Sequence, residues 1–243
     1  MAPRLAYSLF MLLGLTVFLL VRRSVPKPAG VAALPWTHQL ALAIAAFIGG
    51  VFGAKLPFVF ASAASWWSDA AWLADGKTIM TGLGGAYLAV EVVKWFLGIH
   101  VKTGDTFALP LALAMAVGRW GCFCNGCCYG VPTTATWGVD FGDGVPRHPT
   151  QIYESLFHAT MACVILYVML KGWIPTHRLQ LYLIAYCVYR FATEYIRPEP
   201  EWWLRLTFYQ WAALALASGL ALQWWYETRR ANGSTSATTS PHP

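Results

Sequence analysis

Charged residues are scarce in this sequence. Asp, Glu, Lys and Arg make up 12% of its 243 residues, whereas 57% are hydrophobic and the mean hydropathy is +0.48. Because soluble domains carry about 25% charged residues, this composition excludes an ordinary soluble protein and indicates a polytopic membrane protein. The basic residues give a net charge of +6 but lie scattered between apolar runs. This pattern excludes a nucleic-acid partner and suits anionic membrane lipids.

A cleavage site is also missing after the first apolar run, residues 5–21. A secretory signal peptide has basic residues before its apolar run and small residues of the A-x-A kind after it. Here only Arg4 precedes the run, and Arg22, Arg23 and Lys27 follow it. We therefore expect the first run to remain as a transmembrane helix.

The apolar runs predict an all-α membrane bundle of about seven transmembrane helices. A bilayer crossing requires about 20 residues, and the candidate spans are 5–21, 40–54, 79–97, 107–121, 153–170, 179–196 and 206–226. A further run, 58–73, contains Ser and Asp and is typical of an interfacial or partly re-entrant helix. We expect one membrane-embedded domain over 1–230 and a disordered Ser/Thr-rich tail over 231–243.

Loop charges predict the orientation of the bundle. Seven spans place the two termini on opposite sides of the membrane, and cytoplasmic loops carry the excess of Lys and Arg. With the N-terminus outside and the C-terminus cytoplasmic, the inner segments hold eight basic residues, namely Arg22, Arg23, Lys27, Lys102, Lys171, Arg178, Arg229 and Arg230. The loop after residue 118 then faces the outside of the inner membrane.

Two spans contain features that predict helix packing. Gly49, Gly50 and Gly53 lie near the end of the second span, and small residues allow helices to approach closely in lipid. Glu91 and Lys94 are three residues apart in the third span, so they can form an ion pair on one helix face. A structural pair and a functional pair are equally compatible with this spacing.

The richest stretch for function is 118–154. Its first part contains Arg119 and glycines at 118, 121, 126 and 130, a density that lets the backbone turn or approach a ligand closely. Its last part gathers polar groups before the next apolar run, namely Arg147, His148, Gln151, Tyr153 and Glu154. Because charges near hydrocarbon are costly, these groups indicate a functional site.

The sixth span places a second set of polar residues at helical spacing. Tyr182, Tyr186, Tyr189, Arg190 and Glu194 recur every three or four residues, which places them on one helix face. The Arg190 and Glu194 pair is either part of a bundle-facing site or a structural ion pair. Together with Arg119 it predicts guanidinium groups near the outer leaflet, where a phospholipid headgroup supplies the phosphate that such groups bind.

These motifs together resemble the prolipoprotein diacylglyceryl transferases of bacterial inner membranes. GRWGCFCNG at 118–126 is similar to the family's signature, and PRHPTQIYE at 146–154 resembles its H-P-[ST]-Q-L-Y-E segment. YCVYRFATEYIR at 186–197 follows the family's Y-x-x-x-R-x-x-x-E-x-x-R pattern, and Gln210 matches a family glutamine. The GGVFGAKL segment at 49–56 is similar to a family G-A-R-L segment. The resemblance covers about residues 40–211.

The resemblance implies an enzyme that moves a diacylglyceryl group from phosphatidylglycerol to the lipobox cysteine of a secreted prolipoprotein. Phosphatidylglycerol, prolipoprotein signal peptides and membrane lipids are then its partners, and it needs neither a cofactor nor a metal. The catalytic residues that we expect are Arg119, Tyr186, Arg190, Glu194 and His148. The expected substrate-binding residues are Asn125, Gly126, Gly130, Gln151, Glu154 and Arg197.

The sequence departs from the family pattern at three positions. Thr81 stands where the family usually has a histidine in an H-G-G motif, and Cys122 and Cys127 stand where it usually has Asn and Glu. His148 is a candidate to replace the missing base. Two other functions therefore stay open, a non-enzymatic lipid-binding membrane protein on the same scaffold and a membrane thiol-redox or metal protein.

The second of these alternatives depends on four clustered cysteines, C-x-C-x-x-C-C at Cys122, Cys124, Cys127 and Cys128. Thiolates bind zinc or iron–sulfur clusters, but the spacing differs from the two separated C-x-x-C pairs of a zinc ribbon. Packing, a disulfide, a redox or metal site and a catalytic role are the interpretations that the spacing leaves open.

Overall fold

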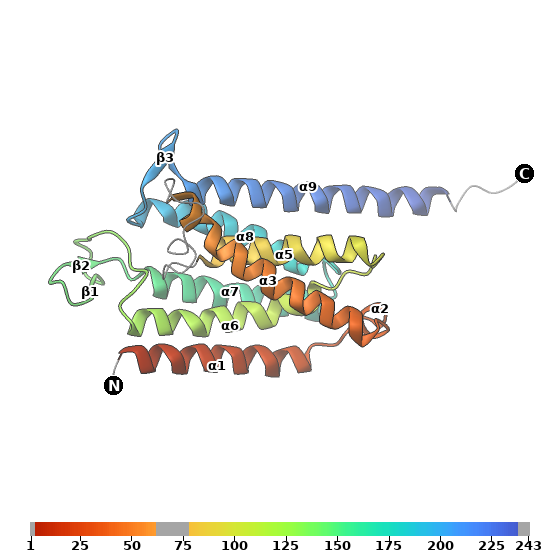
Figure 1. The fold of residues 1–243 in the computed structure, drawn as a ribbon, viewed down its shortest axis with the longest axis horizontal. Coiled ribbons are helices and arrows are strands. Elements are labelled where there is room, and N and C mark those ends of the chain that lie inside the picture. Colours follow the sequence, from red (N-terminus) through yellow and green to blue (C-terminus); the bar gives the residue numbers. More distant parts are fainter. Residues whose placement is uncertain (1–2, 62–77, 238–243) are drawn as a thin grey trace, which may run out of the picture.

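The computed structural model describes residues 3–61 and 78–237 and is a bundle of long helices. Within this part of the chain the long helices are α1 (Pro3–Ser24), α3 (Trp36–Ala61), α5 (Ile79–Phe96), α6 (Asp105–Cys124), α7 (Thr150–Leu170), α8 (Arg178–Thr193) and α9 (Phe208–Ala237). They run roughly along one axis, and the short helix α2 (Ala29–Ala32) lies at one end of the bundle (Figure 1). The all-α membrane bundle that the sequence predicts is confirmed.

Two short hairpins occupy the other end of the bundle, which we call the hairpin end (Figure 1). β1 (Val139–Asp140) pairs antiparallel with β2 (Pro146–Arg147), and β3 (Glu201–Trp203) pairs antiparallel with β4 (Leu206–Thr207). A single 3₁₀ turn, η1 (Glu194–Ile196), continues α8 toward β3. The start of α1 lies at the hairpin end, whereas α9 ends at the end of the bundle where α2 is found (Figure 1).

Within the described residues, four helices are long and apolar enough to cross a membrane: α1, α3, α6 and α7. Each of the seven predicted spans contains a helix, but the number of seven crossings stays a prediction. α8 has 16 residues, fewer than the roughly 20 that a crossing needs. Large apolar side chains lie exposed on the outside of the bundle, such as Leu12 and Phe47, as expected for surfaces that face lipid.

The helices pack in pairs, α3 against α5, α1 against α6, α6 against α7 and α8 against α9. Glycines bring α3 and α5 together, because a Cβ on Gly49 would lie 2.4 Å from the Ala89 Cβ, and one on Gly85 would lie 2.3 Å from the Gly49 carbonyl oxygen. The close approach predicted from Gly49, Gly50 and Gly53 is therefore confirmed. In lipid, such packing replaces the hydrophobic drive that holds soluble cores together.

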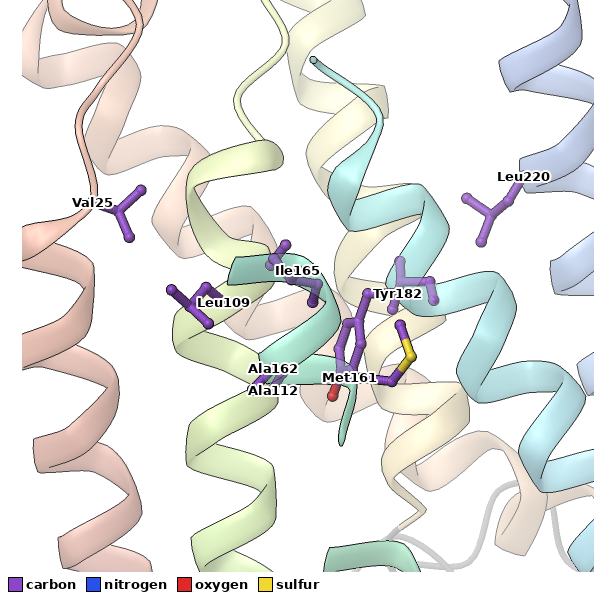
Figure 2. Close-up of a cluster of buried hydrophobic side chains, with 10 residues drawn as sticks. Val25, Leu109, Ala112, Met161, Ala162, Ile165, Tyr182 and Leu220 are labelled. Atoms are coloured by element: carbon purple, nitrogen blue, oxygen red, sulfur yellow. The ribbon is translucent and has the colours of Figure 1, made fainter. Parts of the chain in front are cut away.

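The central core is formed where α6, α7 and α8 meet, as Figure 2 shows. Ala108 and Ala112 of α6 and Ile165 of α7 are fully buried there. Tyr182 of α8 points its ring into the same cluster (Figure 2). Small residues on α6 give the neighbouring helices room to approach.

Three further expectations concern single segments. Lys94 Nζ lies 2.9 Å from Glu91 Oε1, which confirms the predicted ion pair. The predicted interfacial helix 58–73 begins inside α3 and otherwise lies outside the described residues. α9 continues to Ala237, several residues into the segment for which the sequence predicts a disordered tail. The division into a domain and a tail stays a prediction.

Candidate active site

Glu154 lies at the centre of a buried polar cluster at the hairpin end. It lies near the start of α7, is fully buried, and accepts hydrogen bonds from groups of three other segments. Arg119, near the end of α6, donates to its Oε1 from Nη2, and Tyr186 of α8 donates to the same oxygen at 2.5 Å. Arg197, just after η1, donates from Nη2 to Oε2 at 2.7 Å. The carboxylate therefore connects α6, α7 and the end of α8.

A second ion pair lies at the end of α8. Arg190 Nη2 donates to Glu194 Oε2 at 2.7 Å, one helical turn away, and both side chains are buried. Thr207 donates from Oγ1 to Glu194 Oε1 at 3.1 Å, and its backbone N–H donates to Gln210 Oε1 at 2.9 Å. This network attaches η1 to the start of α9. The Arg190 and Glu194 pair predicted from spacing is formed.

Several donors in this cluster have no partner in the described part of the chain. They are buried polar atoms on three arginines and one tyrosine, namely Arg119 Nε, Arg190 Nη1, Arg197 Nε and Tyr189 Oη. Buried donors without partners are costly and rare in folded proteins. Because the cluster also has three guanidinium groups for two carboxylates, it has both the charge and the free donors to bind an anion with several oxygens.

The segment after α6 closes the hairpin end over these residues. Gly126 has φ of +63°, the left-handed conformation that glycine adopts without steric cost. A Cβ on Gly130 would lie 2.5 Å from the Ile196 carbonyl oxygen, so this contact requires glycine. The Val131 N–H donates to the same carbonyl at 2.9 Å. The loop is therefore fixed directly beside the backbone that carries Arg197.

All six cysteines are free thiols, and three of them converge beside the arginines. The sulfurs of Cys122, Cys127 and Cys128 lie within 4.8 Å of one another. The pKa of the Cys128 thiol is lowered, first by hydrogen bonds from the other two thiols and then by the charges of Arg119 and Arg197. The disulfide that the spacing left open is thus not formed among these residues, whereas a redox or metal role stays open.

A family model described as prolipoprotein diacylglyceryl transferase matches residues 4–226. The chain belongs to the prolipoprotein diacylglyceryl transferase family. Two relatives carry the name phosphatidylglycerol–prolipoprotein diacylglyceryl transferase. The one from Clostridium tetani is 33% identical over 68% of this chain and 70% of its own length. The one from Cupriavidus necator is 28% identical over 92% of this chain and 89% of its own length.

Membership of the prolipoprotein diacylglyceryl transferase family confirms the resemblance that the sequence motifs predicted. The family and the four apolar helices make the chain a multi-pass protein of the bacterial inner membrane. The structure brings together six of the predicted site residues, namely Arg119, Glu154, Tyr186, Arg190, Glu194 and Arg197. Their catalytic and binding roles stay predictions.

The other predicted residues of this family member lie in the loop that covers the cluster or at its attachment. Asn125 is the C-cap of α6 and is exposed. Gln151 is buried and donates from Nε2 to the Cys127 carbonyl at 2.6 Å. His148 lies apart from the Glu154 carboxylate, and its Nδ1 contacts the Tyr153 hydroxyl at 3.2 Å. Its place is therefore on the loop side of the site rather than in the buried cluster.

Sequence reasoning missed two residues that complete this cluster. His158 is fully buried, its Nδ1 contacts the Tyr182 hydroxyl at 2.9 Å, and its Nε2 lies 3.8 Å from Glu154 Oε1. Its spacing of four residues from Glu154 on one helix is a signal that could have found it. Thr207 carried no such signal, because its partner Glu194 is thirteen residues away across a hairpin.

A cavity in the described part of the chain lies away from this site. It has a volume of about 370 Å³ and lies toward the opposite end of the bundle. Its lining is mostly apolar but includes the charged residues Arg22, Glu91 and Lys102 and several polar ones, such as Gln39 and Gln180. None of the residues of the Glu154 cluster lines it. We place the candidate active site at the Glu154 cluster because three guanidinium groups with unpartnered donors converge there, whereas the cavity lining is mostly apolar.

Proposed function

We propose that this chain transfers the diacylglyceryl group of phosphatidylglycerol to the thiol of a lipobox cysteine in prolipoproteins. The relatives named above carry that activity in their names, and the chain shares their family over residues 4–226. The observation that carries the proposal is the set of unpartnered guanidinium donors beside Glu154 and Glu194. Phosphatidylglycerol has one phosphodiester, whose single negative charge balances the excess of one positive charge in the cluster.

The arginines act on the phosphate in this proposal. Arg119, Arg190 and Arg197 each use one nitrogen for a carboxylate and keep another free. Glu154 and Glu194 hold the guanidinium groups in place, and Tyr186 fixes the Glu154 carboxylate. When the bond between the glyceryl carbon and the phosphate oxygen breaks, the departing glycerol phosphate gains a negative charge. Fixed donors that bind the gained charge more strongly lower the barrier.

The nucleophile comes from the substrate. A cysteine thiol has a pKa near 8.5 and needs to lose its proton to attack efficiently at neutral pH. The thiolate sulfur forms a bond to the glyceryl CH₂, the C–O bond to phosphate breaks, and glycerol phosphate leaves. We propose His148 as the proton acceptor, because it lies on the loop side of the site and its ring is oriented by Tyr153. Asn125, Gly126, Gly130 and Gln151 shape the entrance for the peptide.

We also propose that the hairpin end faces the outside of the inner membrane, with the N-terminus outside and the C-terminus cytoplasmic. The start of α1 lies at the hairpin end, and α9 ends at the opposite end (Figure 1). Secreted prolipoproteins present their lipobox on the outer side, which is the side where the substrate is needed. The basic residues Arg229 and Arg230 near the end of α9 support a cytoplasmic C-terminus.

The proposal is tested by turnover of purified protein in detergent with phosphatidylglycerol and a synthetic lipobox peptide. Release of glycerol phosphate should accompany a mass gain of the peptide, and Arg119→Ala should lower the rate by at least about 100-fold, the usual effect of removing one charge-stabilising donor. Arg119→Lys tests the two-nitrogen geometry, since it keeps the charge but not the fork. Arg178→Ala is the control, because Arg178 pairs with Asp105 at the opposite end.

The outcomes separate this function from a lipid-binding protein on the same scaffold. A folded wild-type protein that retains phosphatidylglycerol through purification but releases no glycerol phosphate would favour the binding protein. Equal loss of activity in Arg178→Ala and Arg119→Ala would show that the effect comes from folding and not from the cluster.

A further inference from the structure

Three cysteines converge at the end of α6, and they have no role in the transfer as proposed above. Cys122 belongs to the last turn of α6, and Cys127 and Cys128 follow the turn at Asn125 and Gly126. The three sulfurs lie within 4.8 Å of one another although the residues come from a helix and a loop. Arg119 Nη1 lies 4.0 Å from the Cys122 sulfur, so the cluster borders the proposed phosphate site.

Packing or a disulfide explains this arrangement poorly. Buried packing cysteines behave as small apolar residues, but Cys128 is exposed, and Cys122 and Cys127 are only half-buried. A disulfide uses two sulfurs and leaves the convergence of a third without a cause. Three thiols that point to one place are instead the ligand set of a thiophilic metal ion.

The backbone holds the three thiols in this arrangement. Cys128 has φ of +63°, a left-handed conformation that costs a non-glycine residue about 1–2 kcal/mol. Residues in such conformations occur at ligand sites, where the surrounding structure maintains them. Thr150 donates from Oγ1 to the Cys128 carbonyl at 2.6 Å, and Gln151 donates to the Cys127 carbonyl at 2.6 Å. The first turn of α7 therefore fixes both loop cysteines.

We propose that Cys122, Cys127 and Cys128 bind one Zn²⁺ ion and leave its fourth coordination position open for an incoming thiol. Zn–S bonds of about 2.3 Å in a tetrahedral site place the sulfurs about 3.8 Å apart. The sulfurs need to move by no more than about 1 Å each to reach that spacing. Three thiolates and Zn²⁺ carry one net negative charge, which lies beside the Arg119 guanidinium.

The open position gives the site a chemical role, which rests on the proposed function. The lipobox thiol binds Zn²⁺ as the fourth ligand and loses its proton to His148 or to water, so that a zinc-bound thiolate forms at neutral pH. Its sulfur then forms the bond to the glyceryl CH₂, and the C–O bond to the phosphate breaks. The thioether product is a weaker ligand than the thiolate and leaves the metal. No electron is gained or lost in these steps.

The test is metal binding by the full-length reduced protein in detergent, which does not require turnover. The wild-type protein should bind one Zn²⁺ per chain. With Co²⁺ in its place, the protein should show a sulfur-to-cobalt charge-transfer band that intensifies when the lipobox peptide is added. Single Cys122→Ser, Cys127→Ser and Cys128→Ser variants should each lose at least about tenfold in affinity. Cys124→Ser is the matched control, because Cys124 is an exposed neighbour outside the converging three.

Three results would overturn the site: a reduced wild-type protein that binds no zinc, equal affinity in Cys127→Ser and Cys124→Ser, or a cobalt spectrum that a lipobox peptide with Ser in place of Cys changes as much as the thiol peptide does. A different result would contradict the proposed function alone. A protein that shows no transferase activity but still binds Zn²⁺ through the three cysteines would contradict the proposed transfer and leave the metal site intact.

Discussion

Glu154→Gln is the substitution that tests most severely how the charged cluster is stabilised. The side chain is fully buried and accepts hydrogen bonds from Arg119, Arg197 and Tyr186. Glutamine keeps the size but removes the charge, so two buried guanidinium groups lose their counter-ion. Removing one partner of a buried ion pair costs about 3–5 kcal/mol, which for a chain of this size lowers the unfolding midpoint by about 6–20 °C.

The measurement is thermal unfolding in detergent followed by intrinsic tryptophan fluorescence, since the chain has 13 Trp residues. Asp143→Asn is the control, because the Asp143 side chain is 41% exposed and its ion pair with Arg147 lies at the surface. A surface pair of that kind contributes little to stability. A midpoint for Glu154→Gln that falls no further than that of Asp143→Asn would refute the reasoning.

Three further predictions concern other parts of the molecule. Gly85→Val should destabilise the bundle by about 1–3 kcal/mol in thermal unfolding, because the new Cβ would lie 2.3 Å from the Gly49 carbonyl oxygen. Gly219→Ala is the control and should leave the unfolding midpoint unchanged, because a Cβ there meets nothing within 4 Å. Gly130→Ala should lower turnover by up to about 100-fold by displacing the backbone next to Arg197, and unchanged turnover would contradict this. Because the pKa of Cys128 is lowered, iodoacetamide should still label this thiol in the metal-free protein at pH 6. An ordinary thiol reacts more than about tenfold more slowly at pH 6 than at pH 7.5. A labelling rate of Cys128 that falls with pH as much as that of free cysteine would contradict this prediction.

The helices were predictable because a bilayer imposes length and composition on its spans. The positions of Arg119 and Glu154 at neighbouring helix ends also followed from the sequence, since each lies where an apolar run stops or starts. The pair of Arg190 and Glu194 followed from helical spacing alone. These features are local, so the sequence contains enough information to place them.

The rest depends on contacts between segments that are distant in the sequence. The strands β1 to β4 have two or three residues each, too few for any periodicity to appear. Thr207 reaches Glu194 only because the second hairpin folds back onto α8. The cysteine spacing left several interpretations open because the convergence of three sulfurs depends on the left-handed backbone of Cys128.

The central claim is that this chain forms a thioether between a diacylglyceryl group and a lipobox cysteine. The most direct test is the intact mass of a lipobox peptide incubated with the purified wild-type protein and phosphatidylglycerol of a single acyl composition. The account predicts a mass gain equal to that lipid's diacylglycerol minus one water, located on the cysteine, and no gain with Arg119→Ala. An unmodified peptide beside intact protein-bound phosphatidylglycerol would contradict it.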